Sequence, residues 1–459
     1  MRYRISIIVF AMLAFAPALT ACGGKAAAIN TPAQSQPTAT IANPTHVGSD
    51  GQTGDSASFP TFSSPTNITN LFFPVSSIGQ TVLLGQEGGA SLRVETTLLP
   101  DTKAIVWQGG QTEVRVVQYV AYADDKLVEI AYDYLAQADD GDVYYFGEDV
   151  TNYENGQAAN HDGSWLAGKD GAPPAVIMPA HLEAGMIFNP ENLPGVVFET
   201  DEVMSALEKT TTPKGPINDG VLIKETLMDG SIEYKVYAAG YGVVEERAEG
   251  AQVNLVLLNQ TNAAPGVVPG ALQTIEAQAE DIIDIAPVGD WAKVSANVAA
   301  TVEAWKAYQT QATQDGAPRA FQDALASALD RLQTASTAKD SAATMQAANN
   351  LSATVVDLFN VYHPSVPADI GRLDVLERQI FLDVAASNLT AAADNLAKVN
   401  MVWVRVRPSI LAHNSAGVAT QFEASLTAQA NALEEKDVNT LTAEAKNGLE
   451  IVDALEKVY

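Results

Sequence analysis

The pattern of hydrophobic and polar positions divides the chain into two regions with different periods. Between residues 61 and 262 apolar and polar residues alternate, as they do over 115–122 and 127–135, and this alternation predicts half-buried β-strands. From residue 272 onward apolar residues recur at steps of three and four, as in Leu351, Val355 and Leu358, which predicts helices packed along their length. The sequence therefore predicts an α+β protein in which a β domain precedes an all-helical domain.

Glycine-containing turns separate the predicted strands. Asp and Asn before Gly suit tight hairpins because these residues accept a positive φ, and the chain carries Asp140-Gly141, Asn155-Gly156, Asp162-Gly163, Asp170-Gly171, Asp219-Gly220 and Asp229-Gly230. The last of these joins predicted strands at 221–228 and 231–238, and strands at 243–248 and 252–258 follow without room for a helical crossover. We therefore predict an antiparallel meander over 61–262 that closes into a barrel-like or strongly bent sheet.

The helical region contains an internal duplication. Residues of its first half recur in the same order 97 or 98 residues later, for example Trp305, Lys339, Ala348, Val355 and Tyr362 as Trp403, Lys436, Ala445, Val452 and Tyr459. We predict two copies of one four-helix bundle, at 272–362 and 370–459, after a Pro/Gly-rich hinge at 263–271. Trp305 and Trp403 are expected to pack in the two cores rather than to stack on a ligand, and Pro408 is expected to end its helix.

The N-terminus has the features of an export signal. Arg2 and Arg4 precede an apolar run at 7–16, which is too short to span a membrane comfortably, and small residues follow up to Cys22. The stretch Leu19-Thr20-Ala21-Cys22 resembles the bacterial lipobox. The resemblance implies a signal peptide at 1–21 and a diacylated Cys22, whose two acyl chains suffice for stable anchoring. The alternative is an ordinary secreted protein in which Cys22 is incidental.

Cys22 is the only cysteine of the chain. If lipid occupies it, no disulfide, thiolate metal site or cysteine nucleophile is possible. Residues 22–60 are dominated by Ala, Thr, Ser, Pro and Gly, which predicts a lipidated, disordered linker. We expect a protein of the cell envelope, held by lipid at the extracytoplasmic side of a membrane.

The charge of the chain restricts its partners. Fifty-five Asp and Glu residues against 26 Lys and Arg give a formal net charge of −29. Such a field repels nucleic-acid phosphates and favours cations, although solubility alone also explains an acidic surface. We expect no nucleic-acid partner, no cofactor, and an unidentified small-molecule, cation or envelope-protein partner.

Four segments of the β region resemble a group of uncharacterised secreted bacterial proteins. They are YYFGED at 144–149, GSWLAG at 163–168, IMPA at 177–180 and YAAGYG at 237–242. The resemblance extends over about residues 65–260 and implies no activity.

Two groups of carboxylates are candidate metal ligands. Asp139, Asp140 and Asp142 offer hard oxygen ligands for Ca²⁺ but lack the twelve-residue loop with a terminal glutamate, so a solvated hairpin turn is the favoured interpretation. Glu276, Glu280 and Asp284 are spaced to lie on one face of a helix. The second copy has Asp374, Arg378 and Leu382 at these positions, so a solvated acidic stripe is favoured over a metal site in the bundle.

Other reaction signatures are weak. His363 and His413 follow predicted helix ends, outside any His-x-x-x-His or Glu-x-x-His pair, so helix-terminal roles are favoured over metal ligation. The sequence contains no Gly-x-Ser-x-Gly elbow and no complete phosphate-binding Gly-x-x-x-x-Gly-Lys-Ser/Thr loop.

We therefore predict a non-enzymatic binding or scaffolding module, with any ligand pocket in the aromatic-rich β domain, where an apolar or aromatic-stacking ligand would fit. One alternative is a protein that binds or handles metal cations. The other is an envelope hydrolase whose carboxylate pair the sequence does not identify.

Overall fold

The computed structural model describes residues 60–87, 89–212, 215–249, 255–261, 267–362 and 364–459. The predicted signal peptide, Cys22 and the linker up to residue 59 lie outside these residues, as do residues 263–266 of the predicted hinge and His363. No helix within the described ranges is long and apolar enough to cross a membrane.

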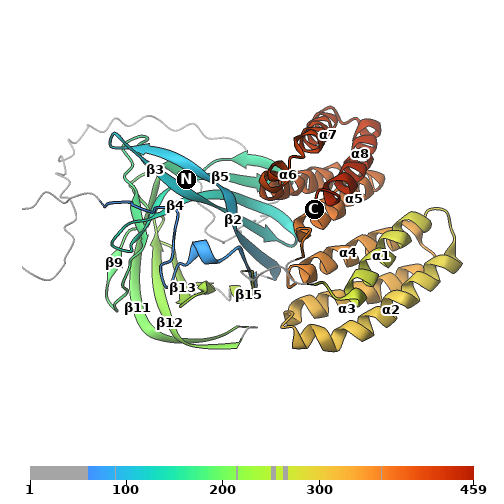
Figure 1. Cartoon of the computed structure of the whole chain (residues 1–459), viewed down its shortest axis with the longest axis horizontal. Helices are drawn as coiled ribbons and strands as arrows, with labels where there is room; N and C mark the ends of the chain where they lie inside the picture. The colour runs from blue at the N-terminus through green and yellow to red at the C-terminus, as the bar shows by residue number, and fades with distance from the viewer. Residues whose placement is uncertain (1–59, 88, 213–214, 250–254, 262–266, 363) are drawn as a thin grey trace, which may run out of the picture. The chain divides into compact units, whose positions relative to one another are not determined.

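The alternating residues form one curled antiparallel sheet (Figure 1). Along its main path the strand order is β10-β11-β12-β13-β14-β15-β1-β2-β3-β4-β5-β6, while β7 and β8 pair with β5, and β9 pairs with β11. The strands, preceded by the short 3₁₀ helix η1 (Val75–Ser77), are β1 (Gln80–Glu87), β2 (Ala90–Trp107), β3 (Gly110–Ala123), β4 (Lys126–Gln137), β5 (Val143–Glu154), β6 (Gln157–Asn160), β7 (Trp165–Leu166), β8 (Ala175–Met178), β9 (Ile187–Phe188), β10 (Asn192–Leu193), β11 (Val197–Thr212), β12 (Gly215–Leu227), β13 (Ile232–Ala238), β14 (Gly242–Ala248) and β15 (Leu255–Thr261). A bent antiparallel meander was predicted, and the fold class is confirmed.

Three of the six predicted hairpins are wrong. Asp162-Gly163 and Asp170-Gly171 lie in turns, but the strands on either side of each turn pair with β5 and not with each other. Asp229-Gly230 does join β12 to β13, but Asp219-Gly220 lies inside β12. A Cβ on Gly220 would come within 2.7 Å of Cγ1 of Val236 on the neighbouring strand. Glycine is therefore needed at this position for close packing within the sheet and not for a turn.

Both faces of the sheet bury apolar side chains, because the strands bend around one core and cover another. On β13, Tyr237 packs in a core with Val203 and Ile223. Its neighbour Val236 points to the opposite face and packs with Val244. The period of two therefore places alternate residues of β13 in different environments.

Eight helices follow the sheet in the described part of the chain. They are α1 (Gly270–Ile285), α2 (Trp291–Gln314), α3 (Arg319–Ala338), α4 (Ser341–Phe359), α5 (Ala368–Ala385), α6 (Leu389–Ala412), α7 (Ala416–Glu435) and α8 (Val438–Glu456). The second, third and fourth helices of each set of four have 24, 20 and 19 residues. The third helix ends in each set on a left-handed lysine, Lys339 or Lys436, and Asp340 or Asp437 then caps the fourth. Paired lengths and caps of this kind are what a duplicated four-helix unit would produce.

Trp305 and Trp403 are buried in the two helical cores. The expected helix end at Pro408 is wrong, because α6 continues to Ala412. Ile410 is fully buried in the core just beyond the proline. We infer that this burial keeps the last turn helical despite the lost backbone hydrogen bond.

A buried ionic network connects α6 with the sheet. Arg405 donates from Nη2 to Oε2 of Glu95 on β2 at 2.8 Å, and from Nε to Oε1 of Gln118 on β3 at 2.7 Å. The side chains of Arg405 and Glu95 are each 3% exposed. Burial alone would raise the pKa of Glu95, but Arg93 and Arg405 hold it well below its usual range.

Candidate functional site

Strand register places acidic residues side by side on the inner face of the sheet. In β11 and β12, Asp201 lies directly opposite Glu225, and in β12 and β13, Glu225 lies directly opposite Glu233. Three adjacent strands therefore present a row of three carboxyl groups. Like charges in directly opposed positions destabilise a sheet, so this arrangement opposes folding unless protons or a cation neutralise it.

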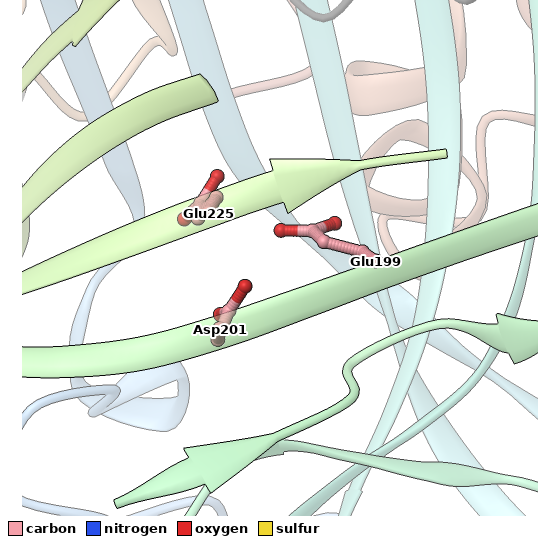
Figure 2. Close-up of side chains that lie close together, drawn as sticks. All are labelled: Glu199, Asp201 and Glu225. Carbon is pink, nitrogen blue, oxygen red and sulfur yellow. The ribbon is translucent and has the colours of Figure 1, made fainter. Parts of the chain in front are cut away.

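Glu199 adds a fourth carboxyl group to this row. It precedes Asp201 by two residues on β11, so both side chains project from the same face of the strand. Figure 2 shows the carboxyl group of Glu199 turned toward the space between Asp201 and Glu225. One oxygen atom from each of these three residues lies within 4.8 Å of the other two.

Lys235 on β13 provides a positive charge beside the row. Its Nζ lies 2.7 Å from Oε2 of Glu225, and its strand partner on β14 is Glu246. Burial alone would lower the pKa of Lys235, but Glu225 and Glu246 raise it well above its usual value. Lys235 therefore stays charged and fixes one oxygen of Glu225.

These residues line one wall of a cavity of about 200 Å³ inside the curled sheet. The other wall comes from β3, β4 and β5, with Tyr119, Tyr145 and several acidic residues. The hydroxyl of Tyr145 donates to Oδ1 of Asp133 at 2.7 Å. Within the described residues Lys235 is the one basic side chain of the lining, against ten acidic ones: Glu129, Asp133, Glu148, Asp162, Glu191, Glu199, Asp201, Glu225, Glu233 and Glu246.

Several of the acidic side chains are deeply buried. Asp201, Glu225 and Glu233 are only 3%, 2% and 6% exposed. Oδ1 of Asp201 and Oε1 of Glu233 are buried and have no hydrogen-bond partner. Because buried polar atoms are normally hydrogen-bonded, each such atom calls for an explanation such as a bound ion or water.

Burial changes the acidity of the row. It raises the pKa of Asp201, with Glu199 and Glu225 adding to the effect. It also raises the pKa of Glu225 in spite of Lys235, and the pKa of Glu233 to about 7. Desolvation disfavours the charged carboxylates, and their mutual repulsion adds to that cost. Without a cation these groups therefore hold protons well above the pH at which exposed carboxyls lose them.

A second cavity, of about 220 Å³, adjoins the acidic one. The two share Tyr119, Tyr237 and Lys235 among their lining residues, and apolar side chains such as Leu83 and Val117 line the rest of the second. The interior of the sheet is therefore acidic on one side and largely apolar on the other.

The first predicted carboxylate group, Asp139, Asp140 and Asp142, stabilises the turn between β4 and β5. Asp139 accepts hydrogen bonds from the backbone N–H and hydroxyl of Ser63, both at 2.8 Å. Asp140 accepts from the N–H of Asp142 at 3.1 Å, and Asp142 accepts from the N–H of Ala180 at 2.7 Å. Each of the three aspartates therefore holds backbone N–H groups around the hairpin, as the turn interpretation expects.

The second predicted group, on α1, does not converge. Glu280 pairs with Arg378 at 2.7 Å, and Asp284 is exposed. Burial raises the pKa of Glu276 to about 8. Among the described residues, carboxylates that could hold a metal ion converge only at Glu199, Asp201 and Glu225.

His413 caps the end of α6. Its Nδ1 lies 2.8 Å from the carbonyl oxygen of Ser409, and its ring packs on Tyr459 with centroids 4.8 Å apart. This is the helix-terminal role expected for it. His363 lies outside the described residues.

The acidic row was not recognised in the sequence, although part of its signal was present. Glu225 and Glu233 lie four residues on either side of Asp229, and the three-residue connection at 228–230 places them opposite each other. Buried charges on one face of a strand are unusual enough to indicate a site.

Comparison with protein-family models, with curated proteins and with solved structures finds no match to this chain.

Proposed function

We propose that this protein is a non-enzymatic binding module, held by lipid at the extracytoplasmic face of a membrane, and that the cavity in its sheet binds a cation. The observation that carries the proposal is the lining of that cavity, with ten acidic side chains and one lysine. A concave site with low-dielectric walls and one sign of charge concentrates ions of the opposite sign. Convergent polar groups in a cavity are typical of ligand sites.

The energetics of the row support the same conclusion. Asp201, Glu225 and Glu233 are buried in directly opposed positions, where ionised carboxylates carry a high desolvation cost. The pair of Glu225 with Lys235 compensates only part of this cost, so the row as a whole opposes folding. A bound cation would supply the missing partner for the orphaned oxygens.

Cation binding is tested by thermal unfolding of the protein, after removal of metals with a chelator, with the chlorides of Ca²⁺, Mn²⁺, putrescine, spermidine and arginine, and with sodium chloride of equal ionic strength as the control. At a ligand concentration of 100 times Kd, binding stabilises the folded state by about 2.7 kcal/mol. We expect at least one of these cations to raise the melting temperature by more than sodium chloride does. Cation stabilisation should disappear in Glu225→Gln and persist in Glu202→Gln, which lies on β11 with its side chain on the opposite face from Asp201. If no cation raises the melting temperature, cation binding is refuted.

The membrane anchor is tested separately. Replacing Cys22 by Ala removes the thiol that the lipobox resemblance assigns to acylation. We expect the variant to leave the membrane fraction, because the proposed anchor is the lipid on Cys22. Persistent membrane association, in a wash at high salt, would contradict lipid anchoring.

An envelope hydrolase is the second candidate function, and the convergence of Glu199, Asp201 and Glu225 is the observation that favours it. Two carboxyl groups about 5 Å apart across a cleft perform retaining glycoside hydrolysis, one as nucleophile and one as acid. Chromogenic glycosides of several sugars test this. Hydrolysis that is lost in Asp201→Asn would replace the non-enzymatic proposal.

A further inference from the structure

We infer that Glu199, Asp201 and Glu225 form a binding site for a single Ca²⁺ ion inside the curled sheet. This inference rests on the proposed cation-binding function and specifies its ligand. Figure 2 shows the three side chains on neighbouring strands with their carboxyl groups facing a common space.

The donor atoms select the class of metal. Glu199, Asp201 and Glu225 offer only carboxylate oxygens to a metal ion, and no His, Cys or Met among the described residues lines the cavity. Hard cations such as Ca²⁺, Mg²⁺ and Mn²⁺ prefer oxygen, whereas Zn²⁺ and Cu²⁺ favour nitrogen and sulfur. The site therefore suits a hard divalent ion.

The coordination preferences of the two ions favour Ca²⁺ over Mg²⁺. The three oxygens lie within 4.8 Å of one another, so one ion that binds oxygen at 2.3–2.6 Å can bridge them. Mg²⁺ binds at 2.0–2.1 Å and demands near-ideal octahedral geometry. Ca²⁺ also accepts the bidentate carboxylates and irregular geometry that strand residues present.

The charge balance indicates a divalent ion. Three carboxylates carry three negative charges, and the ammonium of Lys235, which lies 2.7 Å from Glu225, compensates one of them. Two negative charges remain, which one divalent cation neutralises. Lys235 acts as a positioning residue, because it holds Oε2 of Glu225 and leaves Oε1 for the ion.

Buried oxygens without partners are the independent sign of a missing ligand. Oδ1 of Asp201 belongs to the three-residue group itself. Oε1 of Glu233 lies outside that group, but the residue is 6% exposed, lines the same cavity and stands directly opposite Glu225. A Ca²⁺ ion needs six to eight ligands, and Glu233 and waters in the cavity can complete that number.

The test is direct Ca²⁺ binding to the full chain after removal of metals with a chelator, measured by isothermal titration calorimetry. We expect one Ca²⁺ per chain, binding at least tenfold tighter than Mg²⁺, and at least tenfold weaker binding in Asp201→Asn and Glu225→Gln. Glu202→Gln is the matched control on the same strand and should bind as the parent does. Equal Ca²⁺ binding by Asp201→Asn and the parent would place the ion elsewhere and overturn the inference.

A second measurement does not depend on a variant that folds. Tb³⁺ replaces Ca²⁺ at oxygen sites and luminesces when an excited tyrosine is close, as Tyr119 and Tyr237 are in this cavity. We expect tyrosine-sensitised Tb³⁺ luminescence that stoichiometric Ca²⁺ suppresses. If putrescine or spermidine stabilises the protein while Ca²⁺ and Tb³⁺ do not bind, the metal inference fails and the cation-binding function stands. If neither kind of cation binds, both fail.

Discussion

Replacing Glu95 by Gln tests whether the ionic network between α6 and the sheet stabilises the fold. In the native protein Arg405 is almost completely buried and pairs with Glu95 at 2.8 Å. The glutamine keeps an oxygen acceptor but removes the charge. Arg93 retains Asp357, to which it donates two hydrogen bonds of 3.0 Å, whereas the one carboxylate left beside Arg405 is that of Asp369, at 3.6 Å. The guanidinium of Arg405 is then buried without a full counter-charge.

Removing one partner of a buried ion pair costs about 3–5 kcal/mol, because the remaining charge stays desolvated. We expect a loss of this size in the free energy of unfolding, measured by urea denaturation followed through tryptophan fluorescence and circular dichroism. The double variant Glu95→Leu with Arg405→Met should recover most of the loss, because it removes both charges. Asp323→Asn is the control, since its pair with Arg319 is exposed and should contribute less than about 0.5 kcal/mol. A loss below about 1 kcal/mol in Glu95→Gln would refute the reasoning.

Three further predictions concern the helical domain. Glu377 is fully buried and accepts hydrogen bonds from Gln429, and burial raises its pKa to about 8. Between about pH 4.5 and pH 8 the folded state therefore keeps a proton on Glu377 that the unfolded state loses. The free energy of unfolding should fall as the pH rises through this range. Urea denaturation at several pH values in this range should show that the free energy of unfolding falls less steeply with pH in Glu377→Gln, by on the order of 1 kcal/mol per pH unit. An unchanged pH dependence would contradict the raised pKa of Glu377. A Cβ on Gly448 would meet Cδ of Glu377 at 2.6 Å, so Gly448→Ala should lower the unfolding free energy by about 1–3 kcal/mol. Gly417→Ala is the control and should not lower it, because nothing lies within 4 Å of a Cβ at that position. Lys339 and Lys436 end their helices with φ of 56° and 58°, so glycine at either site should raise the unfolding free energy by about 1 kcal/mol; a loss at both sites would show that lysine contacts outweigh the backbone strain.

The fold class could be predicted because local patterns determine most of it. The alternation over 127–135 and the Asp229-Gly230 turn each report on neighbouring residues, and the structure has a strand and a hairpin there. Similarly, the three-and-four spacing around Val355 needs nothing beyond the helix itself. Pro408 and Gly220 were misread because tertiary packing overrides their local preference, through the buried Ile410 in one case and the close approach of Val236 in the other.

The acidic cavity could not be predicted in full, because it depends on which strands pair and in which register. The pairing of Glu225 with Glu233 follows from the turn between them, but the pairing of Asp201 with Glu225 does not. Between β11 and β12 the register shifts at three places, so counting residues from the connection cannot place Asp201. The opposite wall comes from β3, β4 and β5, which lie far earlier in the chain. The curvature of the sheet brings Glu148 to the same cavity.

If the predicted duplication holds, the contact between Glu280 and Arg378 is an advantage of joining two repeats in one chain. The two residues occupy equivalent positions in the two sets of helices, 98 residues apart, and they pair with each other at 2.7 Å. In a symmetric dimer of identical subunits, equivalent residues that meet near the twofold axis are the same residue, so Glu would face Glu or Arg would face Arg. A single chain is free of that constraint and can encode opposite charges on the two sides. Fusion of the repeats thus permits an attractive contact that no homodimer of either half could make at this position.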